Sequence, residues 1–139
     1  MTDFLDTNVL VYAYDTHEPA KQIIARQILE SAVFEETAAL SAQVLSEFFV
    51  VVTRKISTPL TAEEAKQIIS LFRRLPVAEI DGDLVEAAVV IHQQHNVSFW
   101  DGLIIAAARC LGCTRLLSED MQTGQQIDGL VIVNPFLPV

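Results

Sequence analysis

The stretch Phe4-Leu5-Asp6-Thr7-Asn8-Val9-Leu10 places an acid between two apolar runs. The first run ends at Asp6, and the second begins after two small polar residues, which is typical of a buried strand passing into a helix. We therefore expect Asp6 at the carboxyl end of the first strand. In open parallel α/β sheets, ligands bind at this edge, particularly where the strand order reverses. The segment predicts a crevice that holds a carboxylate.

The rest of the chain alternates apolar strand patterns with helical patterns, which favours an α/β fold around a mainly parallel sheet. The expected strands cover residues 3–5, 37–40, 77–80, 113–117 and 130–133. The expected helices start near Asn8, Pro19, Ala42, Thr61, Asp81 or Gly82, and Ser98, with the second helix ending near Ser31. Gly124 and Gly129 bracket a segment interpreted as a loop. The chain shows no repeat or linker, so residues 1–139 are predicted to form a single domain.

Composition limits the classes of function. The formal net charge of −9 disfavours a surface that attracts nucleic acid through its overall field, so a polyanionic substrate must be held locally by cations or a bound metal. No apolar run approaches the roughly 18 to 20 residues that span a bilayer, and the acidic N-terminus lacks the basic region of a signal peptide. We therefore expect a cytoplasmic protein without membrane segments.

Two short motifs have ordinary structural interpretations. Cys110-x-x-Cys113 could be a redox pair or half a zinc site, but Gly112 marks a helix end and the chain has no further cysteine. Two packed, reduced cysteines are the favoured interpretation. His92-x-x-His95 could ligate a metal in principle, but these residues lie near a predicted helix end, where a cationic imidazole is stabilised by the helix dipole.

Four acids are predicted to meet at the edge that Asp6 occupies. Glu47 lies in an apolar helix, Asp101 opens another apolar helix, and Asp120 or its neighbour Glu119 follows the fourth strand. Carboxylates gathered in one place repel one another unless a cation neutralises them. Mg²⁺ or Mn²⁺ prefers oxygen ligands and commonly combines a few carboxylates with water and substrate phosphate oxygens. The sequence therefore predicts a divalent metal site.

Two of these acids also have simpler interpretations. Glu47 shares a helix face with Val44 and Phe48, and it is either a buried carboxylate or a partly exposed one paired with a lysine or arginine. Asp101 lies three residues after Ser98, a spacing that fits a capping box at the start of a helix. Neither residue identifies a site by itself.

A carboxylate-bound divalent ion suits phosphodiester hydrolysis. Such an ion lowers the pKa of a bound water, polarises the phosphoryl oxygen and stabilises the leaving oxygen. Asp6 and Asp101 are the first choice of ligands, with Glu47 completing the shell or holding a metal-bound water. Asp120 is expected to bind a second ion or to order its waters. Spacing along the chain does not separate these roles.

Four segments of the chain together resemble the signature segments of PIN domains, specifically the VapC-type toxins of bacterial toxin–antitoxin pairs. The segments are Leu5-Asp6-Thr7-Asn8-Val9-Leu10, Ser41-Ala42-Gln43-Val44-Leu45-Ser46-Glu47-Phe48, Ser98-Phe99-Trp100-Asp101-Gly102-Leu103-Ile104 and Leu117-Ser118-Glu119-Asp120-Met121-Gln122-Thr123-Gly124. The match extends over essentially the whole chain in order, spacing and flanking residues.

This resemblance implies a three-layer α/β/α fold and a Mg²⁺- or Mn²⁺-dependent ribonuclease. It also implies inhibition by a VapB-like antitoxin and, commonly, a homodimer. The acids of the family correspond to Asp6, Glu47, Asp101 and Asp120, with Asp120 a better match than Glu119. The resemblance assigns supporting roles to three small polar residues: Thr7, Asn8 and Ser41.

RNA contacts and competing functions are less constrained. Arg54 and Lys55 directly follow the helix that carries Glu47, and they are the best candidates to hold RNA phosphates. Phosphoaspartate chemistry at Asp6 is disfavoured, because haloacid-dehalogenase-like phosphatases need an aspartate where this chain has Asn8. A receiver-like domain would need an acidic pair and a later lysine that are not found. The alternative from another class is a non-catalytic PIN-like module that only binds RNA or protein.

Overall fold

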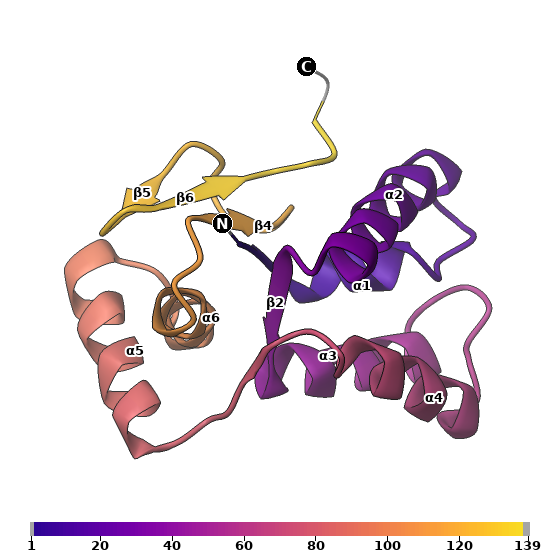
Figure 1. Cartoon of the computed structure of the whole chain (residues 1–139), viewed down its shortest axis with the longest axis horizontal. Helices are drawn as coiled ribbons and strands as arrows, with labels where there is room; N and C mark the ends of the chain where they lie inside the picture. Colours follow the sequence, from indigo (N-terminus) through magenta and orange to yellow (C-terminus); the bar gives the residue numbers. More distant parts are fainter. Residues whose placement is uncertain (1, 138–139) are drawn as a thin grey trace.

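The computed structural model describes residues 2–137. The chain folds into short strands separated by helices (Figure 1). The strands are β1 (Asp3–Leu5), β2 (Ala38–Ser41), β3 (Val77–Ala78), β4 (Arg115–Leu117), β5 (Gln126–Ile127) and β6 (Leu130–Val133). The helices are α1 (Thr7–Tyr12), α2 (Pro19–Glu35), α3 (Ala42–Arg54), α4 (Ala62–Phe72), α5 (Gly82–His95) and α6 (Phe99–Cys110).

The strands form one sheet in the order β3-β2-β1-β4-β6-β5. Every neighbouring pair is parallel except β5 with β6, which confirms the predicted α/β fold with a mainly parallel sheet. The chain proceeds from β1 outward through β2 to β3 and then returns to place β4 on the other side of β1. The strand order therefore reverses between β1 and β4, and their carboxyl ends form the switch point where such sheets bind ligands.

Helices cover both faces of the sheet. On one face, Ile28 and Ala32 of α2 surround a cavity together with Leu5, Ala38 and Leu117 of the strands. These strand residues share a face because side chains alternate along a strand. Figure 1 shows α2 at the right of the view and α5 and α6 side by side at the left.

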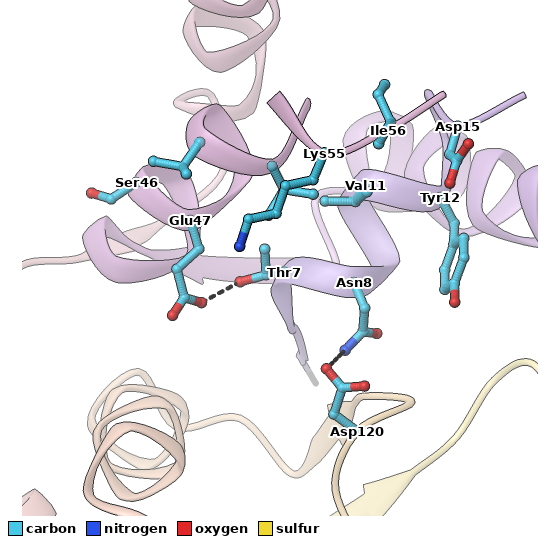
Figure 2. A pocket seen from close by; sticks show the side chains of 12 residues that line it. Thr7, Asn8, Val11, Tyr12, Asp15, Ser46, Glu47, Lys55, Ile56 and Asp120 are labelled. Atoms are coloured by element: carbon cyan, nitrogen blue, oxygen red, sulfur yellow. Dashed lines mark hydrogen bonds between the residues drawn. The ribbon is translucent and has the colours of Figure 1, made fainter. Parts of the chain in front are cut away.

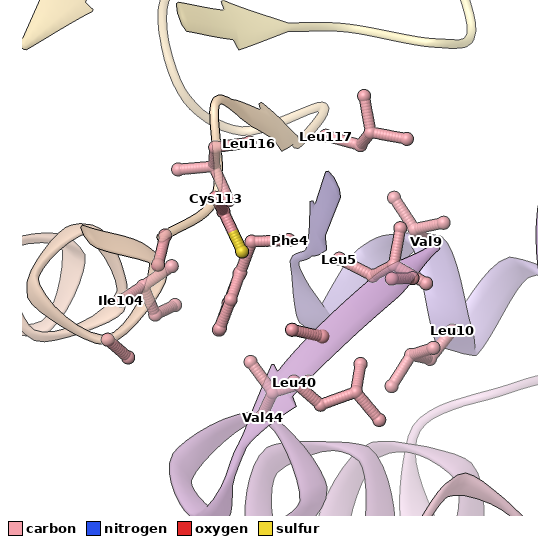
Figure 3. Packing of buried hydrophobic residues seen from close by; sticks show 14 of the residues in the cluster. Phe4, Leu5, Val9, Leu10, Leu40, Val44, Ile104, Cys113, Leu116 and Leu117 are labelled. Atoms are coloured by element: carbon pink, nitrogen blue, oxygen red, sulfur yellow. The ribbon is translucent and has the colours of Figure 1, made fainter. Parts of the chain in front are cut away.

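The opposite face packs against α6. Figure 3 shows Phe4 and Leu116 pointing toward Ile104 of α6, away from Leu5 and Leu117. All five side chains are at most 5% exposed. Since α5 packs along the other side of α6, the arrangement is the expected three-layer α/β/α fold.

Three of the helices that begin with a capping side chain carry predicted site residues in or next to their first turns. The Asp6 carboxylate caps α1, the Ser41 hydroxyl caps α3 and the Ser98 hydroxyl caps α6. Capping residues satisfy backbone N–H groups that a helix leaves unpaired in its first turn. The same short segments therefore end strands, start helices and bring the predicted site residues to one edge.

The predicted loop between Gly124 and Gly129 is wrong, because it contains strand β5. Residues Ile127 and Leu130 pair across a two-residue turn formed by Asp128 and Gly129, both with positive φ. An Asp-Gly pair between apolar residues is a strong hairpin signal, since type I′ turns require positive φ at both positions. Helix α2 also extends beyond the expected Ser31, to Glu35.

No helix among residues 2–137 is both long and apolar enough to cross a membrane.

Candidate active site

Asp6 lies at the switch point and is almost completely buried, with 4% of its surface exposed. Its Oδ1 accepts a hydrogen bond from the Thr7 backbone N–H (2.7 Å), and its Oδ2 accepts one from the Ser118 hydroxyl (2.6 Å). Burial raises the pKa of Asp6 to about 6, although these two hydrogen bonds act in the opposite direction. The negative charges of Asp120 and Glu47 contribute to the rise. The carboxylate therefore lacks full compensation for its lost hydration.

Asn8 connects the acids that follow β1 and β4. Its Nδ2 donates to Asp6 Oδ2 (3.4 Å) and to Asp120 Oδ2 (3.2 Å), and its Oδ1 accepts from the Glu119 backbone N–H (3.1 Å). The Ser118 hydroxyl, which donates to Asp6, also accepts from the Asp120 backbone N–H (3.2 Å). This small network holds the two strand ends together and keeps Asp120 beside Asp6.

Glu119 points into a different environment from Asp120. Its carboxylate forms an ion pair with Lys21 Nζ (2.6 Å) and accepts a hydrogen bond from the Tyr12 hydroxyl. Burial raises the pKa of Glu119, but the bonds from Lys21 and Tyr12 outweigh this effect and hold the pKa below its usual value. Glu119 is thus neutralised by a cation, whereas Asp120 is bonded to the Asn8 amide that also contacts Asp6. This geometry favours Asp120 as the site acid.

Glu47 faces α1 from the neighbouring helix α3. The Thr7 hydroxyl donates to Glu47 Oε1 (2.7 Å), as Figure 2 shows, and Gln43 Nε2 donates to Glu47 Oε2 (3.4 Å). Neither sequence interpretation of Glu47 was fully correct, because the carboxylate is half-buried and receives neutral donors instead of a lysine or arginine.

Asp101 completes the set from the first turn of α6. Its backbone N–H donates to the Ser98 hydroxyl (3.0 Å), so the predicted cap by Ser98 is present. Burial raises the pKa of Asp101, a hydrogen bond from the Ser98 side chain lowers it, and the charges of Asp120 and Glu47 raise it. Because Asp6 and Asp101 both respond to the same two carboxylates, the four acids share one electrostatic environment.

The four predicted site acids form no ion pair with another part of the chain that the structure describes. Within residues 2–137 the ion pairs join Lys21 to Glu119, Arg109 to Asp128 and Arg115 to Asp3, and none involves Asp6, Glu47, Asp101 or Asp120. In the same range, however, no three acids, histidines or cysteines are close enough to hold a metal ion alone. Mg²⁺-type sites usually take part of their shell from water and substrate, so a smaller set of protein carboxylates is compatible with such a site. The charges of Asp120 and Glu47 act on both Asp6 and Asp101.

The donor set fits a hard divalent ion. Carboxylates from different elements face one region, the buried Asp6 is incompletely compensated, and the surrounding hydroxyl and amide groups orient the acids without neutralising them. Oxygen donors of this type suit Mg²⁺ and Mn²⁺ better than softer metals.

A cavity of about 650 Å³ opens beside these acids. Thr7, Asn8, Glu47 and Asp120 line its polar side, together with Lys55. Figure 2 shows the Lys55 side chain extending toward Thr7 and Glu47. The rest of the lining is formed by Val11, Tyr12, Asp15, Ser46, Val50, Val51 and Ile56.

The other predicted site residues occupy different places. Asp6 and Asp101 do not line this cavity; Asp6 lies behind Asn8, to which it is hydrogen-bonded. Arg54 is exposed and also outside the lining. Ser41 is buried and caps α3 by accepting from the Val44 N–H (3.3 Å), so it supports the helix that carries Glu47.

Two residues of the site were missed from the sequence as individual positions. Ser118 appeared only within a motif, yet it is fully buried and donates to Asp6. Gln43 is 6% exposed and donates to Glu47. A polar residue between the apolar positions of a buried helix was the available signal for Gln43.

The motifs interpreted as structural show ordinary contacts. Cys110 is exposed and Cys113 is buried, and the two are free thiols. The His92 ring is hydrogen-bonded to the Val97 carbonyl, which joins the end of α5 to the following loop.

Several solved structures with a similar fold are described as toxins or as toxin–antitoxin complexes. A toxin–antitoxin complex from Klebsiella pneumoniae superposes with a TM-score of 0.70 at 19% identity, covering 96% of this chain and 98% of that chain. VapC20 from Mycobacterium tuberculosis, described as a sarcin–ricin loop cleaving toxin, gives 0.67 at 22% identity over 86% and 90%. FitAB bound to a DNA fragment gives 0.72 at 20% identity over 99% and 98%.

Sequence comparison gives an independent result. No curated protein matches the chain at a significant level. The family model described as the PIN domain matches residues 4–124, which include all four acids. The chain therefore belongs to the PIN-domain family.

Proposed function

We propose that this protein is a divalent-metal-dependent endoribonuclease, and that it is the toxin of a VapBC-type pair. The observation that carries the proposal is that Asp6, Glu47, Asp101 and Asp120 lie near the sheet's switch point and that, within residues 2–137, none of them forms an ion pair. The PIN-domain match and the fold shared with VapC20, described as a sarcin–ricin loop cleaving toxin, support it.

In this proposal Mg²⁺ or Mn²⁺ is held by Asp6 and Asp101, with Glu47 and Asp120 binding it directly or through water. When bound, the ion supplies charge stabilisation and an activated water for phosphodiester hydrolysis. The protein residues provide orientation: Thr7 and Gln43 fix the two oxygens of Glu47, while Asn8 and Ser118 fix Asp6. The buried Asp6 gains most from the ion, because its charge has the least contact with water.

RNA is proposed to enter over the cavity beside the acids. An acidic site in a chain of net charge −9 repels phosphates, so the cation at its rim has a specific use. Lys55 lines the cavity and is placed to hold a phosphate next to the cleaved bond. Arg54, which is exposed one residue earlier, is assigned a weaker contact with the RNA backbone.

Partners are proposed from exposed apolar surface and from the complexes that share this fold. A groove of about 620 Å³ between α2 and α4 is lined by Leu29, Val33, Phe34, Leu71 and Phe72. Phe34 is 90% exposed, which is unfavourable unless a partner covers it. We assign this groove to a VapB-like antitoxin and the exposed valines of α5 to a second copy in a homodimer. Such a toxin would meet its RNA in the cytoplasm.

A cleavage assay on defined RNAs tests the enzymatic part. The purified chain should cleave RNA with Mg²⁺ or Mn²⁺ and not with excess EDTA, and Asp6→Asn or Asp101→Asn should reduce cleavage by ~10²-fold or more. Asp83→Asn is the matched control, because Asp83 is an exposed acid on α5. Circular dichroism must show all variants folded.

The outcomes separate this proposal from its alternative. Metal-independent cleavage, or full activity in both site variants, contradicts the assignment. RNA binding without cleavage under every metal condition would favour a non-catalytic PIN-like module. The toxin role is tested separately: expression should slow growth, and co-expression of a small neighbouring reading frame should relieve it.

A further inference from the structure

Gln43 has a polar side chain in a buried position, and the nitrogen and oxygen of its amide group have different surroundings. Its surface is 6% exposed, and it lies in the first turn of α3. The Nε2 amide donates to Glu47 Oε2 (3.4 Å) and to the Trp100 carbonyl (3.2 Å). Within residues 2–137, its Oε1 is buried without a hydrogen-bond partner.

The orphaned Oε1 indicates that Gln43 is not present for stability. A buried acceptor without a partner loses its hydration and gains nothing in return. A methionine of similar length would fill the same space without this cost. The advantage of glutamine at this position must therefore come from its NH₂ group and the two acceptors that it joins.

Those acceptors belong to different site elements. Glu47 lies one turn further along α3, whereas Trp100 precedes Asp101 in the first turn of α6. The amide therefore links the carboxylate of one acid to the backbone beside another. Since the Thr7 hydroxyl holds Glu47 Oε1, the two hydrogen bonds together restrict rotation of the Glu47 carboxylate.

It is equally important that the Gln43 side chain is uncharged. A lysine at this position would neutralise Glu47 and compete with a divalent ion, as Lys21 neutralises Glu119. An amide orients the carboxylate while leaving its negative charge available. Hydrogen bonds from outside the ligand shell commonly have this function in metal sites.

We propose that Gln43 is a positioning residue that sets the place of Glu47 relative to Asp101 for divalent-ion binding. This inference rests on the proposed metal-dependent function, and it goes beyond the four acids to the group that holds two of them in register.

The test measures Mn²⁺ binding to the purified full chain by electron paramagnetic resonance, which does not depend on RNA cleavage. Gln43→Met should raise the Mn²⁺ dissociation constant by about 10- to 100-fold, the range for outer-shell changes. The same variant should melt at or above the temperature of the original chain, because it removes the orphaned acceptor. If Gln43→Met loses its native circular dichroism, Gln43→Asn replaces it, because the shorter amide cannot reach both acceptors.

Gln22→Met is the matched control. Gln22 also donates from Nε2 to a backbone carbonyl, that of Ala13 (3.3 Å), and among residues 2–137 its side chain shows no hydrogen bond to any of the four acids. This variant should keep the original Mn²⁺ affinity. A second check combines Gln43→Met with Glu47→Gln: if Gln43 acts through Glu47, its substitution should cause little further loss in the Glu47→Gln background.

The results separate this inference from the proposed function. Unchanged Mn²⁺ affinity in folded Gln43→Met, or additive losses in the double variant, overturns the positioning role even if RNA is cleaved. Mn²⁺ binding that depends on Gln43 in a chain that cleaves no RNA supports the positioning role and contradicts the ribonuclease. A chain that binds no Mn²⁺ overturns both.

Discussion

The ladder formed by strands β1 and β4 has an acid near each of its two ends. These two acids have different hydrogen-bond partners. At the amino end, Asp3 is opposite Arg115, which donates to both carboxylate oxygens at 2.9 and 2.7 Å. At the carboxyl end, Asp6 accepts hydrogen bonds from three neutral groups, the Thr7 backbone N–H, the Asn8 amide and the Ser118 hydroxyl. The acid with a cation is the more exposed one; the acid without a cation is buried.

This difference is the opposite of what stability alone would favour. A buried carboxylate is costly and gains more from a cation than an exposed one does. The chain uses its arginine where the need is smaller and leaves Asp6 with a raised pKa. This arrangement at the carboxyl end supports the proposed divalent-ion site.

The largest expected effect comes from giving the carboxyl end its own cation. Asn8→Lys would place an ammonium group between Asp6 and Asp120, where the amide now donates to both. This variant should raise the Mn²⁺ dissociation constant by about 100-fold, at the upper end of outer-shell effects, because it adds a competing charge. Titration calorimetry with Mn²⁺ measures the change, and the melting temperature without metal should rise.

Asn8→Met controls for the loss of the amide itself. It removes the same hydrogen bonds, including the one from the Glu119 N–H, without adding charge. Its Mn²⁺ affinity should fall much less than that of Asn8→Lys. Equal losses in the two variants would mean that the amide, and not the absence of a cation, is what matters.

The second prediction concerns pH and the cost of keeping Asp6 charged. Its pKa rises from 3.8 to about 6 on folding, so the folded chain holds this proton over a pH range where the unfolded chain has released it. The contribution of Asp6 to stability is therefore most favourable below about pH 4 and declines as pH rises toward 6. Asp6→Asn should lack this decline and be more stable than the original chain by about 2 kcal/mol at pH 7.5 without metal.

Urea unfolding at pH 4 and pH 7.5 measures this effect as a difference between the two proteins. Comparing them removes the contributions of other groups, including Glu119, whose pKa shifts the other way. An equal pH dependence of the unfolding free energy in the two proteins would show that burial does not destabilise the charged form of Asp6.

A third prediction tests how closely α6 must approach to deliver Asp101. A Cβ added to Gly102 would lie 2.8 Å from the Ala88 carbonyl of α5, so the helices would have to separate. Alanine normally favours a helix over glycine, but overpacking should outweigh that gain and leave Gly102→Ala less stable by about 1–2 kcal/mol. Thermal unfolding measures the loss, and Mn²⁺ affinity should fall because Asp101 moves with the helix. A variant as stable as the original with full affinity would contradict this account of the α5–α6 contact.

The places of Asp6 and Asp101 at the starts of helices could be predicted from the sequence, because strand–helix transitions have clear local signals. Asp6 ends an apolar run, and Ser98 and Asp101 open a helix at capping spacing. The α/β fold followed from the alternation of strands and helices.

The partners of those acids could not be predicted in the same way, because contacts between distant segments depend on register. That Ser118 bonds Asp6 requires β4 to pair beside β1, and that Thr7 bonds Glu47 requires α3 to cross α1. Nothing in the sequence shows that Lys21 forms its ion pair with Glu119 and not with Asp120. The missed strand β5 is different: its Asp-Gly turn was visible, and the signal was not used.

The smallest expected effect comes from the amino end of the ladder. Arg115→Met would remove the ion pair with Asp3, in which the arginine side chain is 51% exposed. Solvent-exposed pairs contribute little, so stability should fall by less than about 1 kcal/mol, and by less still at high salt. Mn²⁺ affinity should be unchanged, because the side-chain partner of Asp3 is Arg115 and, in the part of the chain that the structure describes, Asp3 shares no hydrogen bond with the four acids. If the Mn²⁺ affinity of Arg115→Met fell as far as that of Asn8→Lys, the two ends of the ladder would be coupled through the strands. Metal binding near Asp6 would then depend on groups outside the site.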